Sequence, residues 1–403
     1  MKTGIYNAID ALQEEMTATR RHLHMHPELS HQEVETPEFI AKQLQALGVE
    51  VRLGVGGRGV VGTIRGGKPG KTIAFRADFD ALPIDDKKDA PYKSTVPGVM
   101  HACGHDGHTA ALLGFAKAMA AIKDELPGTI VLIHQFGEET PPGGSRAMIA
   151  DGCLDGVDLI FGAHVQSSME YGKIFVRDGF LQAAEDTFKI VIRGSGSHGA
   201  EPQLGVDPIL AASHVMIALQ SIVSRNADPL QELVVTVGKF HAGEADNVIP
   251  SEAVLEGTIR VFNPELRQLA RERLTSIAEN VARAMGATAE VAIEAGYDSL
   301  WNHAEAMAMV RAAARKTVGE DALVEIDPIM PVEDFAYYTQ KVPGAFFFVG
   351  AKMEDDALSF PHHHENFDFN EGAMAIAAKV FAAAYFEAQK SGMDCISDTA
   401  DSK

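Results

Sequence analysis

The order of strand-like and helix-like segments is the feature that most constrains how this chain can fold. Up to about residue 185, short apolar runs typical of buried strands alternate with segments of helical periodicity, such as GTIVLIHQFGEE after GHTAALLGFAKAMAAIK. The alternation resumes after about residue 298 and ends with NEGAMAIAAKVFAAAYFEAQK. This order predicts an α/β domain of three layers around a mostly parallel sheet.

A different order interrupts the alternation. Its segments follow the order strand, helix, strand, strand, helix, strand, which is the ferredoxin-like pattern. The second of these helices has Pro264 at its start, where the missing N–H costs nothing. We therefore predict a discontinuous α/β domain made of residues 1–185 and 297–403, with an inserted βαββαβ domain at residues 186–296.

Composition excludes several classes of partner. A formal net charge of −21 argues against a surface that binds nucleic acid or anionic membrane. No apolar run reaches the length of a membrane span, and MKTGIYNAIDALQEEM lacks the pattern of a secretion signal. Three cysteines form no disulfide framework: Cys103, Cys153 and Cys395. We expect a cytoplasmic protein in a reducing compartment, without nucleic-acid or membrane partners.

Polar side chains follow three of the predicted parallel strands. Asp78 and Asp80 come after TIAFR, Glu138 and Glu139 after TIVLIHQF, and His164 after LIFGA. In open α/β sheets, ligands bind beyond the carboxyl ends of the strands. We therefore expect these side chains to meet at one edge of the sheet.

The segment MHACGHDGHTA adds soft donors immediately before a helix. Cys103 and His105 are two residues apart, so both can point the same way in an extended loop. A thiolate and a neutral imidazole are ligands for zinc and related metals. Glu139, His164 and a later histidine would complete a site. Three consecutive histidines are available for that last position: His362, His363 and His364.

The adjacent glutamates suit hydrolysis assisted by a metal. One of Glu138 and Glu139 can bind a cation while the other faces the water, whose pKa a metal lowers towards about 7. Other hydrolytic motifs are missing, because the sequence contains neither H-E-x-x-H nor G-x-S-x-G. Each feature alone has a structural explanation, such as a buried cysteine or a solvated histidine loop, but their joint occurrence favours a metal site.

Several segments together resemble a known family. They include RRHLHMHPELSHQE, FRADFDALPI, MHACGHDGHTAALLG, EDFAYY, VPGAFFFVG and FDFNE, in this order over about residues 8–390. The chain resembles the N-acyl-amino-acid amidohydrolases, which include hippurate hydrolase and the plant auxin-conjugate hydrolases. This group is a branch of the aminoacylase and carboxypeptidase G metallopeptidases.

The resemblance implies two divalent metal ions per subunit, with zinc, manganese, cobalt and nickel all compatible with the donors. The ligand positions of the family are occupied here by Cys103, His105, Glu139, His164 and His363. His363 is preferred over its neighbours because the family places its last ligand four residues before the aromatic residue that is Phe367 here.

The resemblance also implies roles for five further residues. Glu138 stands at the position of the general base, and Asp80 at that of a carboxylate that orients a metal ligand. His198 matches a histidine that reaches the substrate carbonyl, often from a partner subunit. Asn247 and Arg260 match positions that hold the substrate carboxylate. The inserted domain resembles a lid and dimerisation domain, which implies a homodimer or homotetramer.

The implied activity is hydrolysis of the amide bond of N-acyl amino acids, with hippurate-like or N-acetyl substrates. A dipeptidase or carboxypeptidase on the same scaffold is an alternative within the family. A catalytically silent protein that binds a metal or small ligand is an alternative of another class. The sequence leaves the acyl group, the amino-acid preference and the native metal open.

Overall fold

The computed structural model describes residues 2–390, so Cys395 lies outside the described residues. The chain splits into two compact units. The large unit comprises Met1–Leu181, Trp301–Asp327 and Asp334–Lys403, and the small unit comprises Gln182–Leu300 and Pro328–Glu333.

The unit boundaries lie a few residues from the predicted ones. The predicted inserted domain spanned residues 186–296, whereas the small unit begins at Gln182 and includes a separate segment, 328–333. That segment belongs to the small unit because Ile329 forms a parallel bridge with Gln182 and accepts a hydrogen bond from the backbone of Ala183 at 3.2 Å. Pairing over this sequence distance has no local signal in the sequence.

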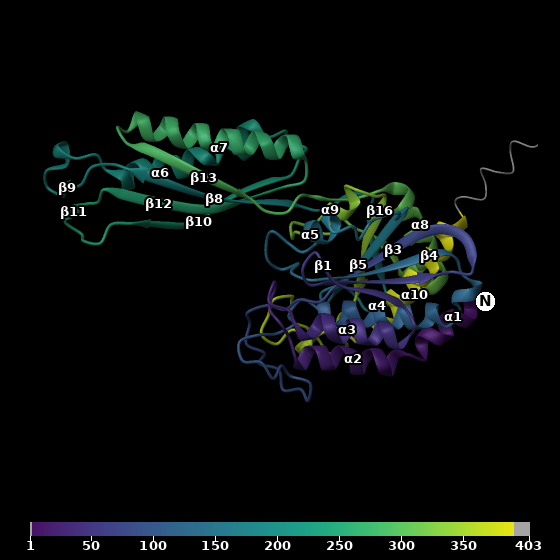
Figure 1. Cartoon of the computed structure of the whole chain (residues 1–403). Coiled ribbons are helices and arrows are strands. Elements are labelled where there is room, and N and C mark those ends of the chain that lie inside the picture. The colour runs from purple at the N-terminus through teal and green to yellow at the C-terminus, as the bar shows by residue number, and fades with distance from the viewer. Residues whose placement is uncertain (1, 391–403) are drawn as a thin grey trace, which may run out of the picture. The chain divides into compact units, whose positions relative to one another are not determined.

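An eight-stranded sheet forms the centre of the large unit (Figure 1). In spatial order its strands are β1 (Glu50–Val55), β2 (Gly59–Arg65), β4 (Pro127–Gln135), β3 (Lys68–Asp78), β5 (Leu159–Gln166), β16 (Gly344–Gly350), β6 (Ile174–Val176) and β15 (Leu323–Glu325). The central strands β4, β3, β5 and β16 are parallel, while β1 and β2 form an antiparallel hairpin at one edge. The predicted α/β class with a mainly parallel sheet is confirmed.

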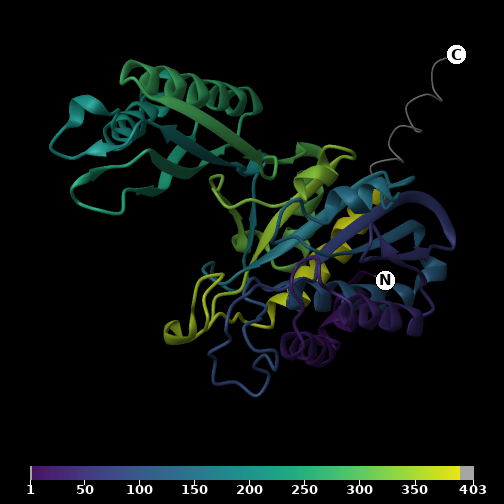
Figure 2. The ribbon, with the colours of Figure 1, turned by 60° about the vertical axis from the view of Figure 1, so that its left-hand side comes forward.

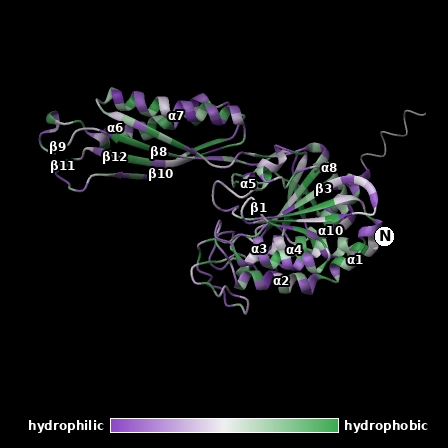
Figure 3. Cartoon of the chain, viewed as in Figure 1, coloured by the Kyte–Doolittle hydropathy of each residue, from purple (hydrophilic) through white to green (hydrophobic). Residues whose placement is uncertain are grey.

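Helices cover this sheet and bury its apolar strands. They are α1 (Lys2–Asp10), α2 (Gln13–Met25), α3 (Glu35–Ala46), α4 (His105–Ala120), α5 (Ser145–Ala150), α8 (Ala304–Thr317), α9 (Ala336–Thr339) and α10 (Ala373–Lys390). Helices α4 and α10 pack on β3 and β5, and α1 and α2 pack outside them (Figures 1 and 2). Figure 3 shows the central strands of this sheet as largely hydrophobic. A cluster of aromatic rings fills the interface, with Phe75 4.7 Å from Phe115 and 5.2 Å from Phe381 between ring centroids.

The small unit has the predicted ferredoxin-like order. Its elements are β8 (Ala184–Arg193), α6 (Pro208–Leu219), β10 (Leu233–Ala242), β12 (Glu252–Val261), α7 (Pro264–Ala284) and β13 (Thr288–Ala295). The sheet is antiparallel throughout, in the order β10-β12-β8-β13. Helix α7 begins as predicted, because Asn263 caps it through the backbone N–H of Glu265 at 2.8 Å and Pro264 follows the cap.

Two further pairs of short strands complete the description. The strands β9 (Ser197–His198) and β11 (Val248–Ile249) pair with each other, and β7 (Gly179–Gln182) pairs with β14 (Leu300–Asn302). The pairing of β9 with β11 is antiparallel and sets His198 opposite Val248.

One stretch of the described residues, Pro208–Asn226, is long and apolar enough to cross a membrane by length and composition. It consists of α6 and a π-helical turn, Ile222–Asn226. Its inner face, which includes Val215 and Leu219, is buried in the core of the small unit. An apolar helix with one face in a protein core passes the same test, so length and composition alone carry no argument for a membrane span.

Candidate metal centre

Three adjacent strands bring carboxylate and imidazole groups to one edge of the large sheet. The strands β4, β3 and β5 are parallel neighbours, so their carboxyl ends point the same way (Figure 1). Strand β3 ends at Asp78 with Asp80 just beyond it, Glu138 and Glu139 follow β4, and His164 lies near the end of β5. The edge is therefore rich in groups that can bind a cation.

The loop before α4 holds Cys103, and α4 itself begins with His105, near the end of β5. Gly104, between them, has a φ angle of 91°, a left-handed conformation that glycine adopts without strain. A Cβ atom at this position would lie 2.6 Å from a methyl group of Val165 on β5. The Sγ atom of Cys103 is thereby placed 3.4 Å from Nε2 of His164.

Two groups of candidate ligands share Cys103. In the first group, donor atoms of Cys103, His105 and Glu139 all lie within 4.8 Å of one another. In the second group, donor atoms of Cys103, His164 and His362 also lie within 4.8 Å of one another. A thiolate shared by two sets of donors suits two neighbouring cations, and the mixture of thiolate, imidazole and carboxylate suits zinc and other first-row metals.

Unpaired buried atoms support this interpretation. His105 Nε2, Glu139 Oε1 and His362 Nδ1 are buried without a hydrogen-bond partner among the described residues. A buried polar atom without a partner costs about 1–3 kcal/mol. The other nitrogen of His105, Nδ1, lies 3.1 Å from Asp80 Oδ1, so the ring presents Nε2 toward Glu139 Oε1 at 3.6 Å. These free donors fit a cation between them.

His164 and His108 differ in whether they keep a nitrogen for a cation. Nδ1 of His164 donates to the carbonyl oxygen of Val165 at 2.6 Å, which leaves the Nε2 lone pair facing Cys103. Both nitrogens of His108 are occupied, because Nδ1 donates to Asp78 at 2.6 Å and Nε2 accepts from the backbone N–H of Val165 at 2.9 Å. His108 therefore supports β5 and has no lone pair left for a metal.

Asp80 connects two predicted ligands. Its Oδ2 atom accepts a hydrogen bond from the Ser30 hydroxyl at 2.7 Å and another from the backbone N–H of Glu139 at 2.9 Å. Its Oδ1 atom faces His105. The carboxylate thus fixes the orientation of one ligand and the backbone position of another.

The segment after β16 brings two histidines to the centre, whereas the sequence predicts one. Nε2 of His363 lies 3.4 Å from Glu139 Oε2, with 52% of the His363 side chain exposed. His362, another of the three candidates, lies on the side of Cys103 and His164. The run of histidines is the available signal in the sequence. It cannot decide their directions because His363 has a left-handed backbone, with φ of 64°.

The sequence profile of peptidase family M20/M25/M40 matches residues 74–387. The chain belongs to this family. It is 42% identical over 372 residues to the N-acetyl-L-cysteine deacetylase of Bacillus subtilis, covering 92% of this chain and 87% of that protein. It is 38% identical over 379 residues to thermostable carboxypeptidase 1 of Saccharolobus solfataricus, covering 93% of this chain and 96% of that protein.

A solved structure agrees with the family and the fold. The Bacillus subtilis YxeP protein, described as a dinuclear metal binding peptidase of the M20 family, matches with a TM-score of 0.82 and 35% identity. The match covers 94% of this chain and 99% of that one. The predicted membership of the amidohydrolase and metallopeptidase group is confirmed.

Carboxylates give the centre of this M20/M25/M40 member a negative potential. Burial opposes a charge on His105, but Asp78, Asp80 and Glu139 outweigh it and raise the pKa of His105 to about 10. Burial, reinforced by Glu139, raises the pKa of the Cys103 thiol well above its usual range. The centre therefore favours positive charge and disfavours a free thiolate. A bound cation would supply that positive charge and replace the protons on Cys103 and His105.

Glu138, the predicted general base, is buried at the turn after β4. The backbone N–H of Gly137, just before it, donates to Glu33 Oε1 at 2.9 Å. Glu33 therefore holds the turn that carries Glu138 and Glu139. Reasoning from the sequence missed Glu33, because nothing in the segment HQEVE distinguishes it from the exposed Glu35 two residues later.

The three predicted substrate-binding residues lie in the small unit. His198 on β9 is close to Asn247, because the backbone N–H of Gly199 donates to the Asn247 carbonyl at 2.8 Å. Arg260 is near the C-terminal end of β12 and forms an ion pair with Glu185 at 2.9 Å. Within the small unit, therefore, His198 and Asn247 are brought together and Arg260 is separate from them.

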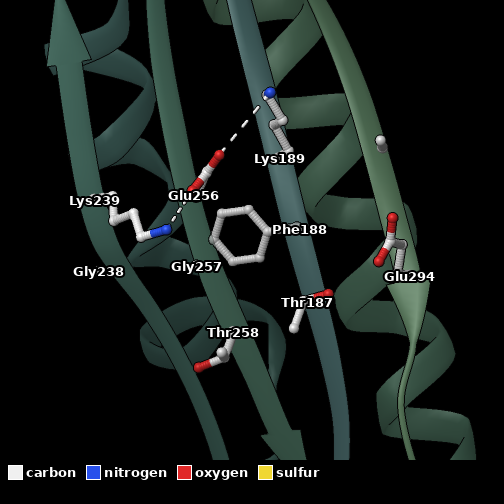
Figure 4. Close-up of a pocket in the computed structure, with 10 residues that line it drawn as sticks. Thr187, Phe188, Lys189, Gly238, Lys239, Glu256, Gly257, Thr258 and Glu294 are labelled. Carbon is white, nitrogen blue, oxygen red and sulfur yellow. Dashed lines mark hydrogen bonds and ion pairs between the residues drawn. The ribbon is translucent and has the colours of Figure 1, made fainter. Parts of the chain in front are cut away.

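A separate hollow lies on the sheet of the small unit (Figure 4). It has a volume of about 450 Å³. Two lysines and two glutamates line it, so their formal charges balance, and Glu256 lies 2.9 Å from Lys239 and 4.0 Å from Lys189. Its lining residues include no histidine or cysteine, so the hollow lacks the donors for metal-assisted chemistry.

Proposed function

We propose that this chain is a metal-dependent amidohydrolase that cleaves the amide bond of N-acyl amino acids and holds two divalent cations. The observation that carries the proposal is the pair of donor groups sharing Cys103, with their unpaired buried atoms. The deacetylase relative supports the choice of an N-acyl amino acid as substrate. We assign the cations to Cys103, His105, Glu139, His164 and a histidine of the segment after β16.

The bound cations would polarise the scissile carbonyl and lower the pKa of the attacking water. Glu138 takes a proton from that water and passes it to the leaving amine. His198 is suited to stabilise the developing negative charge. Its Nδ1 accepts the backbone N–H of Ala200 at 3.0 Å, so the neutral ring carries its proton on Nε2 and can donate it to the carbonyl oxygen.

Asn247 and Arg260 are our candidates for holding the substrate carboxylate. Although Arg260 pairs with Glu185, its Nη1 is buried without a hydrogen-bond partner among the described residues. One arm of the guanidinium is therefore available to a carboxylate. Replacement of Arg260 by Lys should raise KM for N-acyl amino acids more than it lowers kcat.

Glu138→Gln tests the general base. We expect turnover of N-acetyl and N-benzoyl amino acids to fall by about 10²–10⁴-fold, because the amide cannot accept a proton from water. Metal content, measured on the same preparation, should stay at the wild-type level. Glu38→Gln, an exposed residue on α3, is the matched control and should keep full activity. Full activity of Glu138→Gln with metal bound would remove Glu138 from this role.

Peptide hydrolysis is a second candidate activity, because a carboxypeptidase is also a relative. Both reactions use the same centre and differ in the group on the acyl side of the bond. Values of kcat/KM on N-acetyl and N-benzoyl amino acids, compared with those on dipeptides and longer peptides bearing the same C-terminal residue, distinguish the two. Higher values on peptides would replace the amidohydrolase proposal with a peptidase.

We also propose that the small unit mediates a homodimer or homotetramer. Large apolar side chains are exposed along α6, with Ile217 66% and Leu210 52% exposed, and Val234 on the edge strand β10 is 39% exposed. Covering such a surface favours self-association. Light scattering should give a multimer for the wild type and a smaller species for Ile217→Glu. A monomeric wild type would refute the proposal.

A further inference from the structure

The three consecutive histidines after β16 differ in their surroundings. His364 is engaged locally, because its ring stacks on Phe360 at 4.6 Å and its Nδ1 accepts the backbone N–H of Asn366 at 3.1 Å. His363 reaches Glu139 from a half-exposed position. His362 turns toward Cys103 and His164. The family pattern implies one metal ligand in this segment, His363, and gives no reason for the inward direction of His362.

His362 is held firmly in this inward position. Its ring centroid lies 5.2 Å from that of His164 and 4.8 Å from that of Phe367. These ring contacts hold the imidazole beside the candidate ligands Cys103 and His164.

The hydrogen bonds of His362 are incomplete. Nε2 takes only a long hydrogen bond of 3.3 Å from the backbone N–H of Ser167, and Nδ1 is buried with no partner among the described residues. A neutral imidazole has one donor nitrogen and one acceptor nitrogen. Whichever nitrogen carries the proton, a buried ring atom is left poorly paired, which is unfavourable.

The second donor group also needs His362. Without His362, this group has only the shared thiolate of Cys103 and a nitrogen of His164. His164 is also grouped with His105 and His108, but both nitrogens of His108 are occupied and His105 is also grouped with Glu139. Protein sites that bind zinc for catalysis normally supply three ligands and leave one position open. His362 brings this group to three, while His363 lies against Glu139.

We propose that His362 is itself a metal ligand, binding the cation held by Cys103 and His164, with His363 binding on the side of Glu139. This inference rests on the dinuclear centre proposed above. It makes the centre of this chain richer in imidazole than the five-ligand set that the family pattern implies.

Titration of the metal-free protein with Co²⁺ tests the assignment without relying on activity. Visible absorption of bound Co²⁺ reports the coordination of each site, and competition with a chelator reports its affinity. We expect the wild type to bind two Co²⁺ ions. His362→Gln keeps an acceptor for the Ser167 N–H. It should weaken the binding of one of the two Co²⁺ ions by at least about 100-fold. Removing a residue that only supports a ligand typically costs about 10–100-fold in affinity, so a loss of this size indicates a lost ligand. The visible spectrum of the variant should change for that ion alone.

His364→Gln is the matched control and should retain both ions with wild-type spectra, because His364 stacks away on Phe360. If His362→Gln does not fold, NMR of the wild-type cobalt protein tests the assignment, because the ring N–H proton of each coordinating histidine is paramagnetically shifted. Four coordinating histidines support the assignment and three overturn it. Unchanged affinities and spectra in folded His362→Gln also overturn it, while leaving the proposed function intact. A wild type that binds no metal would refute the proposed function itself.

Discussion

The buried carboxyl group of Glu33 makes a strong prediction about stability and pH. Its side chain is 1% exposed. Burial and the nearby charge of Asp80 raise the pKa of Glu33 from 4.5 to about 7, although hydrogen bonds from backbone N–H groups, including that of Gly137, act in the opposite direction. The folded protein therefore keeps this proton across a pH range in which the unfolded chain has lost it.

The sign and the size follow from this difference. Between pH 4.5 and 7 the unfolded state binds fewer protons than the folded state, so the free energy of unfolding falls as pH rises. Integrated between pH 5 and pH 8, the Glu33 contribution falls by about 2–3 kcal/mol. Glu33→Gln mimics the protonated acid and keeps an acceptor for the Gly137 N–H, so it should abolish this contribution.

The assay is urea denaturation of the metal-free protein at pH 5 and pH 8. Other groups titrate in this range, so the quantity of interest is the difference between Glu33→Gln and wild type at each pH. The variant should gain about 2–3 kcal/mol relative to wild type on going from pH 5 to pH 8. Glu35→Gln removes an exposed carboxylate two residues away and should change stability by less than about 0.5 kcal/mol at either pH. A Glu33→Gln difference that is the same at both pH values would refute the reasoning.

Three further predictions concern buried charge and the metal centre. Arg76→Met should destabilise the protein by about 3–5 kcal/mol in denaturant titrations, because two buried carboxylates lose their partner. They belong to Asp78, 2.6 Å from Arg76, and Asp334, 3.0 Å from it. The control Arg65→Met breaks an exposed ion pair and should cost about 1 kcal/mol or less. Asp80→Asn should weaken metal binding by about 10–100-fold in chelator competition, and unchanged affinity would contradict its orienting role. Removing metal with a chelator should lower Tm, and readdition should restore it; a Tm indifferent to metal would contradict the proposed centre.

Sequence periodicity determined the architecture because it reports local conformation and burial. The switch from alternating strands and helices to the βαββαβ order predicted an inserted unit, and the structure has that order. The start of α7 was equally readable from Pro264, and the structure adds the cap at Asn263. The donors at the carboxyl ends of β3, β4 and β5 were also recognisable, because the ends of neighbouring parallel strands all lie at one sheet edge.

Tertiary structure alone decided which of these donors are free to bind a cation. His105 and His108 are alike in the sequence, but packing gives one an unpaired nitrogen and saturates the other through Asp78 and Val165. His362 and His363 are neighbours that approach different donors, and the left-handed backbone of His363 between them and the rest of the segment is not encoded in the spacing. Composition and periodicity report which residues are near a site, whereas the hydrogen bonds that occupy or free each lone pair form between segments far apart in the chain.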